Sequence, residues 1–333
     1  MSDYGKRHLQ DPKRAARSAD GRIVAHSARA AFMNENAKEL LGEIGRQLDC
    51  HVFPKVKNGG FVMPGQSTDS LNRPGEEHYY EPERQRRPAT DARPGAVGRQ
   101  GTPGEPWGAG RPRPSSGPPP VVGTDQSDVY RGSLSSVCEA YPGARIWWQD
   151  GGFWLFAKSS LLPGLGRKAG FLVGVSSKRK EVRSWAFWYG GVAGAAWIGP
   201  RHTNFPDGSI CAYEPRDGTW AFGDSLVTLL DLYSVWALRH LHHEAFGRWP
   251  GPQAVAQPYE RMLELADDEH CGCLSSEGRR YADCCKTKDL QRNRIVEAMK
   301  FGFFSCWSLR FPPTPILRFV RDWNQPPSLA ELV

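Results

Sequence analysis

The sequence predicts an α+β protein, in which an antiparallel sheet is flanked by helices and followed by a small cysteine-rich knuckle. Two patterns lead to this class. A short amphipathic pattern at residues 127–141 precedes four segments rich in aromatic and apolar residues, and a long leucine-rich helical pattern at 224–246 follows them. Because helices and strands occur in separate blocks, the strands are expected to pair with their sequence neighbours as an antiparallel meander.

Turn and capping residues set the boundaries of these elements. The glycine pair at 151–152 and the stretch 163–170 separate strands, and Asp224 is a good N-cap for the long helix. Gly247 follows that helix and ends it. Strands are expected at residues 145–148, 152–157, 171–176 and 182–189, and further helices at 258–267, 289–301 and 315–323.

Composition confines the folded core to the C-terminal two-thirds of the 333 residues. Residues 64–120 contain 12 Pro and 9 Gly, whereas eleven of the twelve Trp follow Pro120. We therefore expect residues 1–63 to be a tail with one helix at 25–48, and residues 64–124 to be a disordered linker rich in Pro, Gly and Arg.

Charge argues against nucleic acid as a partner. The net charge is +7, but residues 1–120 carry 19 Lys and Arg against 14 Asp and Glu, whereas residues 121–333 carry 24 against 22. The expected folded part is thus almost neutral and lacks the basic surface that a phosphate backbone needs. The charged N-terminus has no signal-peptide pattern and no segment suits a membrane span, so we expect a cytoplasmic protein with reduced cysteines.

One short segment contains the residues of a known catalytic motif. The motif consists of a His-x-Asn triplet, an Asp-Gly turn leading to a cysteine, and a tryptophan before the long helix: His202-Thr203-Asn204, Asp207-Gly208-Ser209-Ile210-Cys211 and Trp220. This segment resembles the ubiquitin-conjugating enzymes, and the order of helix, meander, cysteine loop and helices fits their UBC fold. The resemblance covers residues 125–268. Thr203 replaces the proline of the family, and the interval from Asn204 to Cys211 is one residue shorter.

The resemblance implies that Cys211 is the nucleophile of an acyl carrier, which holds a protein C-terminus as a thioester and passes it to an amine. The Asn204 amide would then donate a hydrogen bond to the oxyanion. His202 would either fold the loop, as family precedent favours, or assist proton transfer. Glu214 and Asp217 are alternative acceptors for the proton of the incoming amine.

The sequence is similar to a bacterial branch of this family that is found in antiphage defence systems signalling with cyclic oligonucleotides. There the partner is a cGAS-like nucleotidyltransferase, whose C-terminus would be the donor polypeptide. The chain shows no Gly-rich nucleotide loop followed by a helix. Activation of the donor is therefore expected to need a separate enzyme or the partner itself.

Two close cysteine pairs at residues 269–288 predict a zinc knuckle. The pairs are Cys271 with Cys273 and Cys284 with Cys285, and four thiolates suit tetrahedral Zn²⁺ in a structural role. The segment 278–285 resembles the second half of the SEC-C zinc motif known from the SecA translocase, with a two-residue insertion before it. His270 is an alternative to Cys285 as the fourth ligand.

Two other interpretations remain open at this point. In the first, the protein is a non-catalytic, zinc-containing adaptor that only binds protein partners, and Cys211 has no chemical role. In the second, it is a zinc-dependent nucleic-acid binder, which the near-neutral folded part disfavours. His240, His242 and His243 are interpreted as cations that suit the C-terminal end of the long helix, and residues 289–333 as a C-terminal helical segment.

Overall fold

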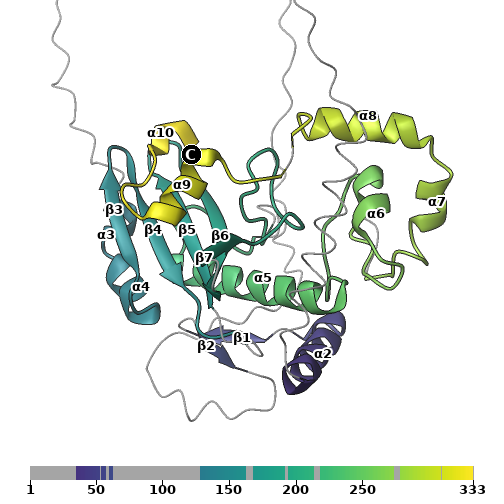
Figure 1. The fold of residues 1–333 in the computed structure, drawn as a ribbon, viewed down its shortest axis with the longest axis horizontal. Helices are drawn as coiled ribbons and strands as arrows, with labels where there is room; N and C mark the ends of the chain where they lie inside the picture. The colour runs from purple at the N-terminus through teal and green to yellow at the C-terminus, as the bar shows by residue number, and fades with distance from the viewer. Residues whose placement is uncertain are drawn as a thin grey trace, which may run out of the picture.

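The computed structural model describes residues 35–52, 54–57, 60–62, 128–162, 168–191, 194–213, 218–273, 278–308 and 310–332. The expected linker at 64–124 lies outside these residues. Within them the fold is α+β, as the sequence predicts, and its centre is a five-stranded antiparallel sheet (Figure 1).

The sheet is a simple meander, in which each strand pairs with the next one in the sequence. Four of its strands match those expected, and β7 is additional. Three of the four residues of β7 are Gly or Ala, which are depleted in strands, so its conformation comes mainly from pairing with β6. The strands are β3 (Arg145–Gln149), β4 (Gly152–Lys158), β5 (Lys168–Ser176), β6 (Glu181–Gly191) and β7 (Gly194–Trp197).

Both faces of the sheet are covered, because large apolar residues occur at consecutive positions of the central strands. Phe153 and Leu155 of β4 belong to the core shared with α5 (Leu226–Phe246). Trp154 and Phe156 point to the opposite face and pack against α9 (Thr314–Asp322) and α10 (Leu329–Leu332) (Figure 1). The C-terminal segment therefore contributes a second layer of the core.

The helix expected at 127–141 is interrupted. It forms α3 (Asp128–Arg131) and α4 (Leu134–Ala140), because Ser133 turns its hydroxyl back onto the Tyr130 carbonyl oxygen, 2.9 Å away. The N-cap of α5 is Ser225 rather than Asp224. Asp224 closes the preceding turn instead, where its carboxylate accepts from the Ala221 amide at 2.8 Å.

The expected N-terminal tail contains a helix that packs in the main core. It is α2 (Glu35–Asp49), and its Leu41, Ile44 and Leu48 are at most 1% exposed. A two-stranded sheet of β1 (Lys55–Lys57) and β2 (Gly60–Val62) follows it. Helix α2 packs on α5, so this part of the chain belongs to the same folded body as the sheet.

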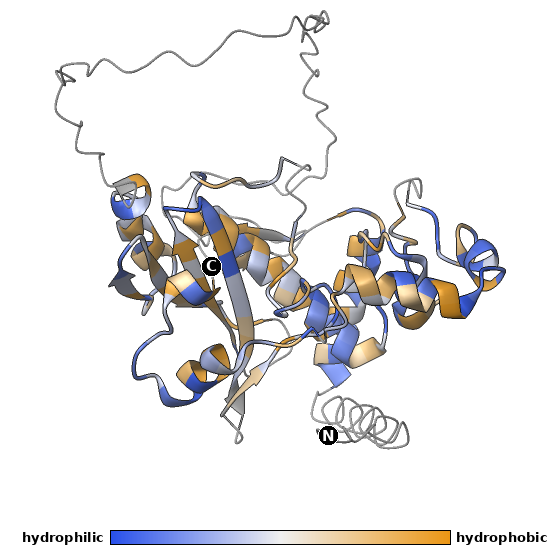
Figure 2. Ribbon diagram, turned by 90° about the horizontal axis from the view of Figure 1, so that it is seen from above, coloured by the Kyte–Doolittle hydropathy of each residue, from blue (hydrophilic) through white to orange (hydrophobic). Residues whose placement is uncertain are grey.

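A helical arm extends beyond the sheet. It consists of α6 (Pro258–Glu264), α7 (Lys286–Leu290) and α8 (Arg294–Phe304), at the right of Figures 1 and 2. Hydrophobic residues, orange in Figure 2, continue into this arm. Among the described helices, none combines the length and the apolar character that crossing a membrane would require.

The packing of α2 on α5 predicts opposite effects for two alanine substitutions in one helix. A methyl group on Gly45 would lie 2.2 Å from Nε2 of the buried His242, whereas one on Gly42 would make an ordinary contact of 3.7 Å with Phe246. Gly45→Ala should lower the free energy of unfolding by about 1–3 kcal/mol because of overpacking. Gly42→Ala should raise it by up to about 1 kcal/mol through helix propensity.

Urea unfolding of the two variants measures these changes directly. Destabilisation by both substitutions, or by neither, would contradict the packing of α2 seen here.

Candidate functional site

A closed loop brings the sequence-predicted catalytic residues together. Thr203 and Ile210 form an isolated antiparallel bridge, and the Cys211 amide donates to the His202 carbonyl oxygen at 3.1 Å. Inside the bridge, the backbone amide of Asn204 donates to the Ser209 carbonyl oxygen at 2.7 Å. The shorter interval between Asn204 and Cys211 is therefore closed by backbone hydrogen bonds.

The Asp-Gly turn of this loop is attached to β6 and to the C-terminal segment. The Asp207 carboxylate pairs with Arg183 at 2.6 Å, and its carbonyl oxygen accepts from Trp185 Nε1 at 2.9 Å. Gly208 has φ 63°, and a methyl group there would meet the Phe311 backbone at 2.9–3.0 Å. Glycine is required at this position both by its conformation and by the close approach of residue 311.

The Asn204 side chain lies over the peptide that precedes the cysteine. Its Nδ2 donates to the Ile210 carbonyl oxygen at 3.0 Å and to the Ser209 hydroxyl at 3.3 Å, while the residue as a whole is exposed. The amide thus stabilises the loop and also carries its donor next to residue 211.

His202 has the geometry of a structural residue. Its Nε2 lies 2.9 Å from Oε1 of Gln253, and its ring contacts Trp249 with centroids 4.1 Å apart. Burial, together with the charges of Arg201 and Arg239, holds its pKa well below the usual value. The ring is therefore neutral near pH 7, and these contacts favour loop folding over proton transfer.

Cys211 is partly exposed and has a cationic neighbour that the sequence analysis missed. Burial lowers the pKa of Arg310 to about 10, and the charge of Cys211 opposes this shift. The Arg310 guanidinium lies over the Phe205 ring, 4.1 Å from its centroid, and pairs with Glu264 at 3.1 Å and with Glu260. A nearby cation stabilises a thiolate, whether it attacks or leaves.

No sequence signal identified Arg310, because it lies about a hundred residues after Cys211 and outside every motif. The alternative proton acceptors Glu214 and Asp217 fall outside the described residues.

Two of the three histidines of α5, His240 and His242, are buried and are not cations at a helix end. Burial holds the pKa of His240 well below the usual value and lowers that of His242 to about 4. His240 packs edge-on against Trp249, with centroids 4.9 Å apart, and His242 Nδ1 lies 3.2 Å from the Arg248 carbonyl oxygen. The cationic role expected for these two residues is therefore wrong.

The four predicted cysteine ligands converge. Their sulfur atoms all lie within 4.8 Å of one another, with Cys273 and Cys284 at 3.7 Å and Cys284 and Cys285 at 3.8 Å. Ligands 2.3 Å from a tetrahedral Zn²⁺ are about 3.8 Å apart, so these separations fit such an ion. Burial raises the pKa of the Cys271 thiol. A cation bound between the four sulfur atoms would favour their thiolate forms.

A short hairpin between residues 270 and 280 carries Cys271 and Cys273, and Cys284 and Cys285 follow it in the turn before α7. His270 and Arg280 form an antiparallel bridge, and the Cys271 amide donates to the Arg279 carbonyl oxygen at 2.9 Å. His270 is not part of the sulfur cluster. Its Nε2 lies 3.9 Å from Asp49, and its ring is edge-on to His51. Cys285, rather than His270, therefore completes the group of four side chains that could hold a metal ion.

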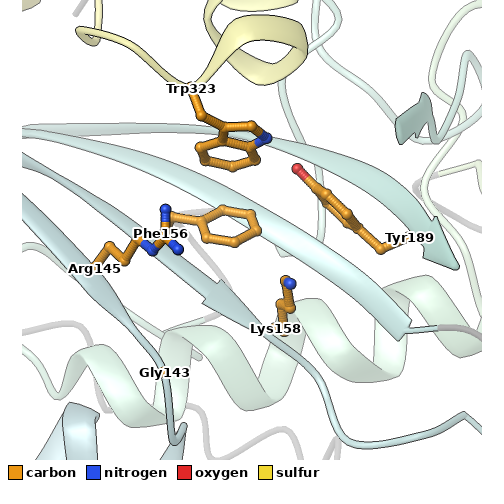
Figure 3. Close-up of a pocket in the computed structure, with 6 residues that line it drawn as sticks. All are labelled: Gly143, Arg145, Phe156, Lys158, Tyr189 and Trp323. Atoms are coloured by element: carbon orange, nitrogen blue, oxygen red, sulfur yellow. The ribbon is translucent and has the colours of Figure 1, made fainter. Parts of the chain in front are cut away.

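A small hollow elsewhere in the fold contains none of the predicted site residues. Its volume is about 160 Å³, and its wall combines aromatic rings with two cationic side chains (Figure 3). Lys158 lies over the Tyr189 ring, 5.1 Å from the centroid. The lining residues are Gly143, Arg145, Phe156, Lys158, Tyr189 and Trp323.

No protein-family model, curated protein or solved structure matches this chain. Inferences about its chemistry therefore depend on the arrangement of its own residues.

The buried histidines predict that the protein loses stability in acid. Because the pKa of His242 falls from 6.5 in the unfolded chain to about 4 in the folded one, its contribution is fully present above pH 6.5 and disappears as the pH falls toward 4. A shift of this size corresponds to about 3 kcal/mol. His242→Gln should flatten the dependence of the unfolding free energy on pH in this range.

Urea titrations of the wild type and of His242→Gln between pH 7 and pH 4.5 measure this difference. Equal slopes in the two proteins would show that His242 is not held neutral.

Proposed function

We propose that the protein is an acyl carrier similar to the ubiquitin-conjugating enzymes, which holds a polypeptide C-terminus as a thioester on Cys211 and transfers it to an amine. The observation that carries the proposal is the closed loop of residues 202–211. It presents a partly exposed thiol next to the Asn204 amide and near the Arg310 cation. A helix, an antiparallel meander, the cysteine loop and the long helix α5 follow one another in the order of the UBC fold.

Each step of this reaction can be assigned to named groups. The Cys211 thiolate attacks the carbonyl carbon of an activated C-terminus, and the activating group leaves with its electron pair. An acceptor amine then attacks the thioester carbonyl, and the resulting oxyanion is stabilised by the Asn204 donor. The intermediate expels the Cys211 thiolate, whose charge Arg310 stabilises, while the proton of the amine passes to solvent or a base.

The donor that the resemblance implies is the C-terminus of a cGAS-like nucleotidyltransferase, in an antiphage defence system. Activation of that C-terminus would be supplied by a separate enzyme or by the partner. Four cysteines that could hold a metal ion support a structural zinc site, since all four positions around the ion are taken by protein and none is left for substrate.

A second candidate function is a non-catalytic adaptor that binds protein partners. It is favoured by apolar side chains on the helical arm that are exposed to solvent. Ile295 is 73% exposed and Phe303 69%; just beyond α8, Trp307 is 65% exposed, and its ring centroid lies 5.7 Å from that of Phe303. Exposed apolar residues that lie together mark interaction surfaces. A binding arm is also compatible with catalysis, so the chemistry of Cys211 decides between the two functions.

Co-expression with the neighbouring genes tests the proposed nucleophile. We expect a protein adduct on non-reducing gels that disappears on reduction, and Cys211→Ser should convert it into an ester that resists thiols. Cys211→Ala should abolish the adduct, whereas Cys138→Ala, which removes an exposed thiol, should retain it. An adduct that persists in Cys211→Ala would show that the nucleophile is another residue.

The metal assignment predicts about one zinc per chain, as expected for a single four-ligand site. Cys273→Ser should remove most of the metal, while Cys306→Ser changes an exposed thiol outside the cluster and should leave it bound. Elemental analysis of the purified proteins provides the measurement. Wild-type protein without zinc, or equal zinc in the two variants, would contradict a four-cysteine zinc site.

A further inference from the structure

A buried ion pair connects the cysteine knuckle with the Cys211 loop. Arg201 Nη1 donates to Oε1 of Glu269 at 2.9 Å, and the two side chains are only 6% and 0% exposed. Arg201 directly precedes His202, and Glu269 lies two residues before the ligand Cys271. The two ends of this pair therefore belong to the two candidate sites.

The amide of Gln253 bridges the same two segments with its two ends. Its Oε1 accepts from Arg201 Nη2 at 3.0 Å and lies 2.9 Å from His202 Nε2. Its Nε2 donates to the His270 carbonyl oxygen at 2.7 Å. The acceptor end thus contacts the loop, and the donor end contacts the residue next to Cys271.

The backbone around Gln253 also rests on the knuckle. The Val255 amide donates to the Gly272 carbonyl oxygen at 2.8 Å. Gly272 has φ 70°, and a methyl group there would lie 2.9 Å from the Gln253 carbonyl oxygen. Because Gly272 is between the ligands Cys271 and Cys273, a metal ion bound there would fix the surface on which Gln253 lies.

His202, which contacts Gln253 through its side chain, is also hydrogen-bonded directly to Cys211 through its backbone. Its carbonyl oxygen accepts both from the Cys211 amide at 3.1 Å and from Trp236 Nε1 at 2.9 Å. A displacement of His202 therefore changes the backbone position of Cys211 directly.

We propose that Gln253 is a positioning residue, through which metal binding at the four cysteines keeps the Cys211 loop closed. A hairpin this small derives much of its folding free energy from its metal. When the metal leaves, His270 and Gly272 lose their fixed positions, so Gln253 no longer holds His202, and Arg201 is left as a buried charge with one partner fewer. Such a charge is costly, so the loop opens to solvate it.

This coupling differs from the sequence-based division at residues 268 and 269, which treats the knuckle as a separate unit. The proposal rests on the proposed function only in regarding the 202–211 loop as the site of chemistry. The test reads the opening of the loop, so it does not require Cys211 to form an adduct.

Hydrogen exchange of the 333-residue chain, loaded with Zn²⁺ or treated with EDTA, tests the coupling. In the wild type, removal of zinc should accelerate exchange in residues 202–211 about tenfold and leave strand β4 unchanged. Gln253→Met removes both the acceptor and the donor of the Gln253 side chain, and with them its hydrogen bonds to the loop and to His270. Its 202–211 segment should exchange fast even with zinc bound, and EDTA should add little.

Gln257→Met is the matched control, because this residue lies four positions further on and its side chain makes no capping hydrogen bond. It should respond to EDTA as the wild type does. The proposal is overturned if zinc removal leaves exchange of the wild-type loop unchanged or accelerates β4 equally. It is also overturned if Gln253→Met and Gln257→Met respond to EDTA alike.

If no adduct forms on Cys211, the proposed function is contradicted, but zinc can still slow hydrogen exchange in residues 202–211 through Gln253. The two failures are therefore distinguishable.

Discussion

The buried pairing of Arg201 with Glu269 is the constraint on which both candidate sites depend. An ion pair removed from water needs further hydrogen bonds to its atoms, and here Gln253 accepts from Arg201 Nη2 while the Trp249 amide donates to Glu269. Those bonds orient His202 on one side and the start of the cysteine hairpin on the other. The loop that presents Cys211 and the hairpin that gathers four thiols are consequently one continuous structure.

Much of the fold could be predicted from local patterns. The strands around Trp154 and Trp185 are dense in aromatic and apolar residues, and α5 carries a regular leucine stripe between clear end signals, so tertiary contacts reinforce a preference that is already local. Strand β7 and the docking of α2 could not be predicted in this way. The docking of α2 depends on α5, which is distant in the sequence. Strand β7 is short and rich in Gly and Ala, so its own composition gives only a weak strand signal, and its pairing with the neighbouring β6 determines its conformation.

The candidate site shows the same division. The short-range motif placed Cys211, Asn204 and His202 together, and the paired cysteines identified their own cluster. Arg310 and Gln253 are distant in sequence and belong to no motif, so only the folded arrangement reveals them. The interpretation of His240 and His242 failed because burial, which decides whether a histidine carries charge, is not visible in a helix-end pattern.

The central claim is that this arrangement makes Cys211 a nucleophile, and the most direct test is site-resolved alkylation by iodoacetamide near pH 7. Cys138 and Cys306 are more exposed than Cys211 and would react faster if access alone mattered. The account predicts that Cys211 reacts first, and that Arg310→Met removes its advantage. Reaction of Cys211 at or below the rate of the two exposed thiols would contradict the account.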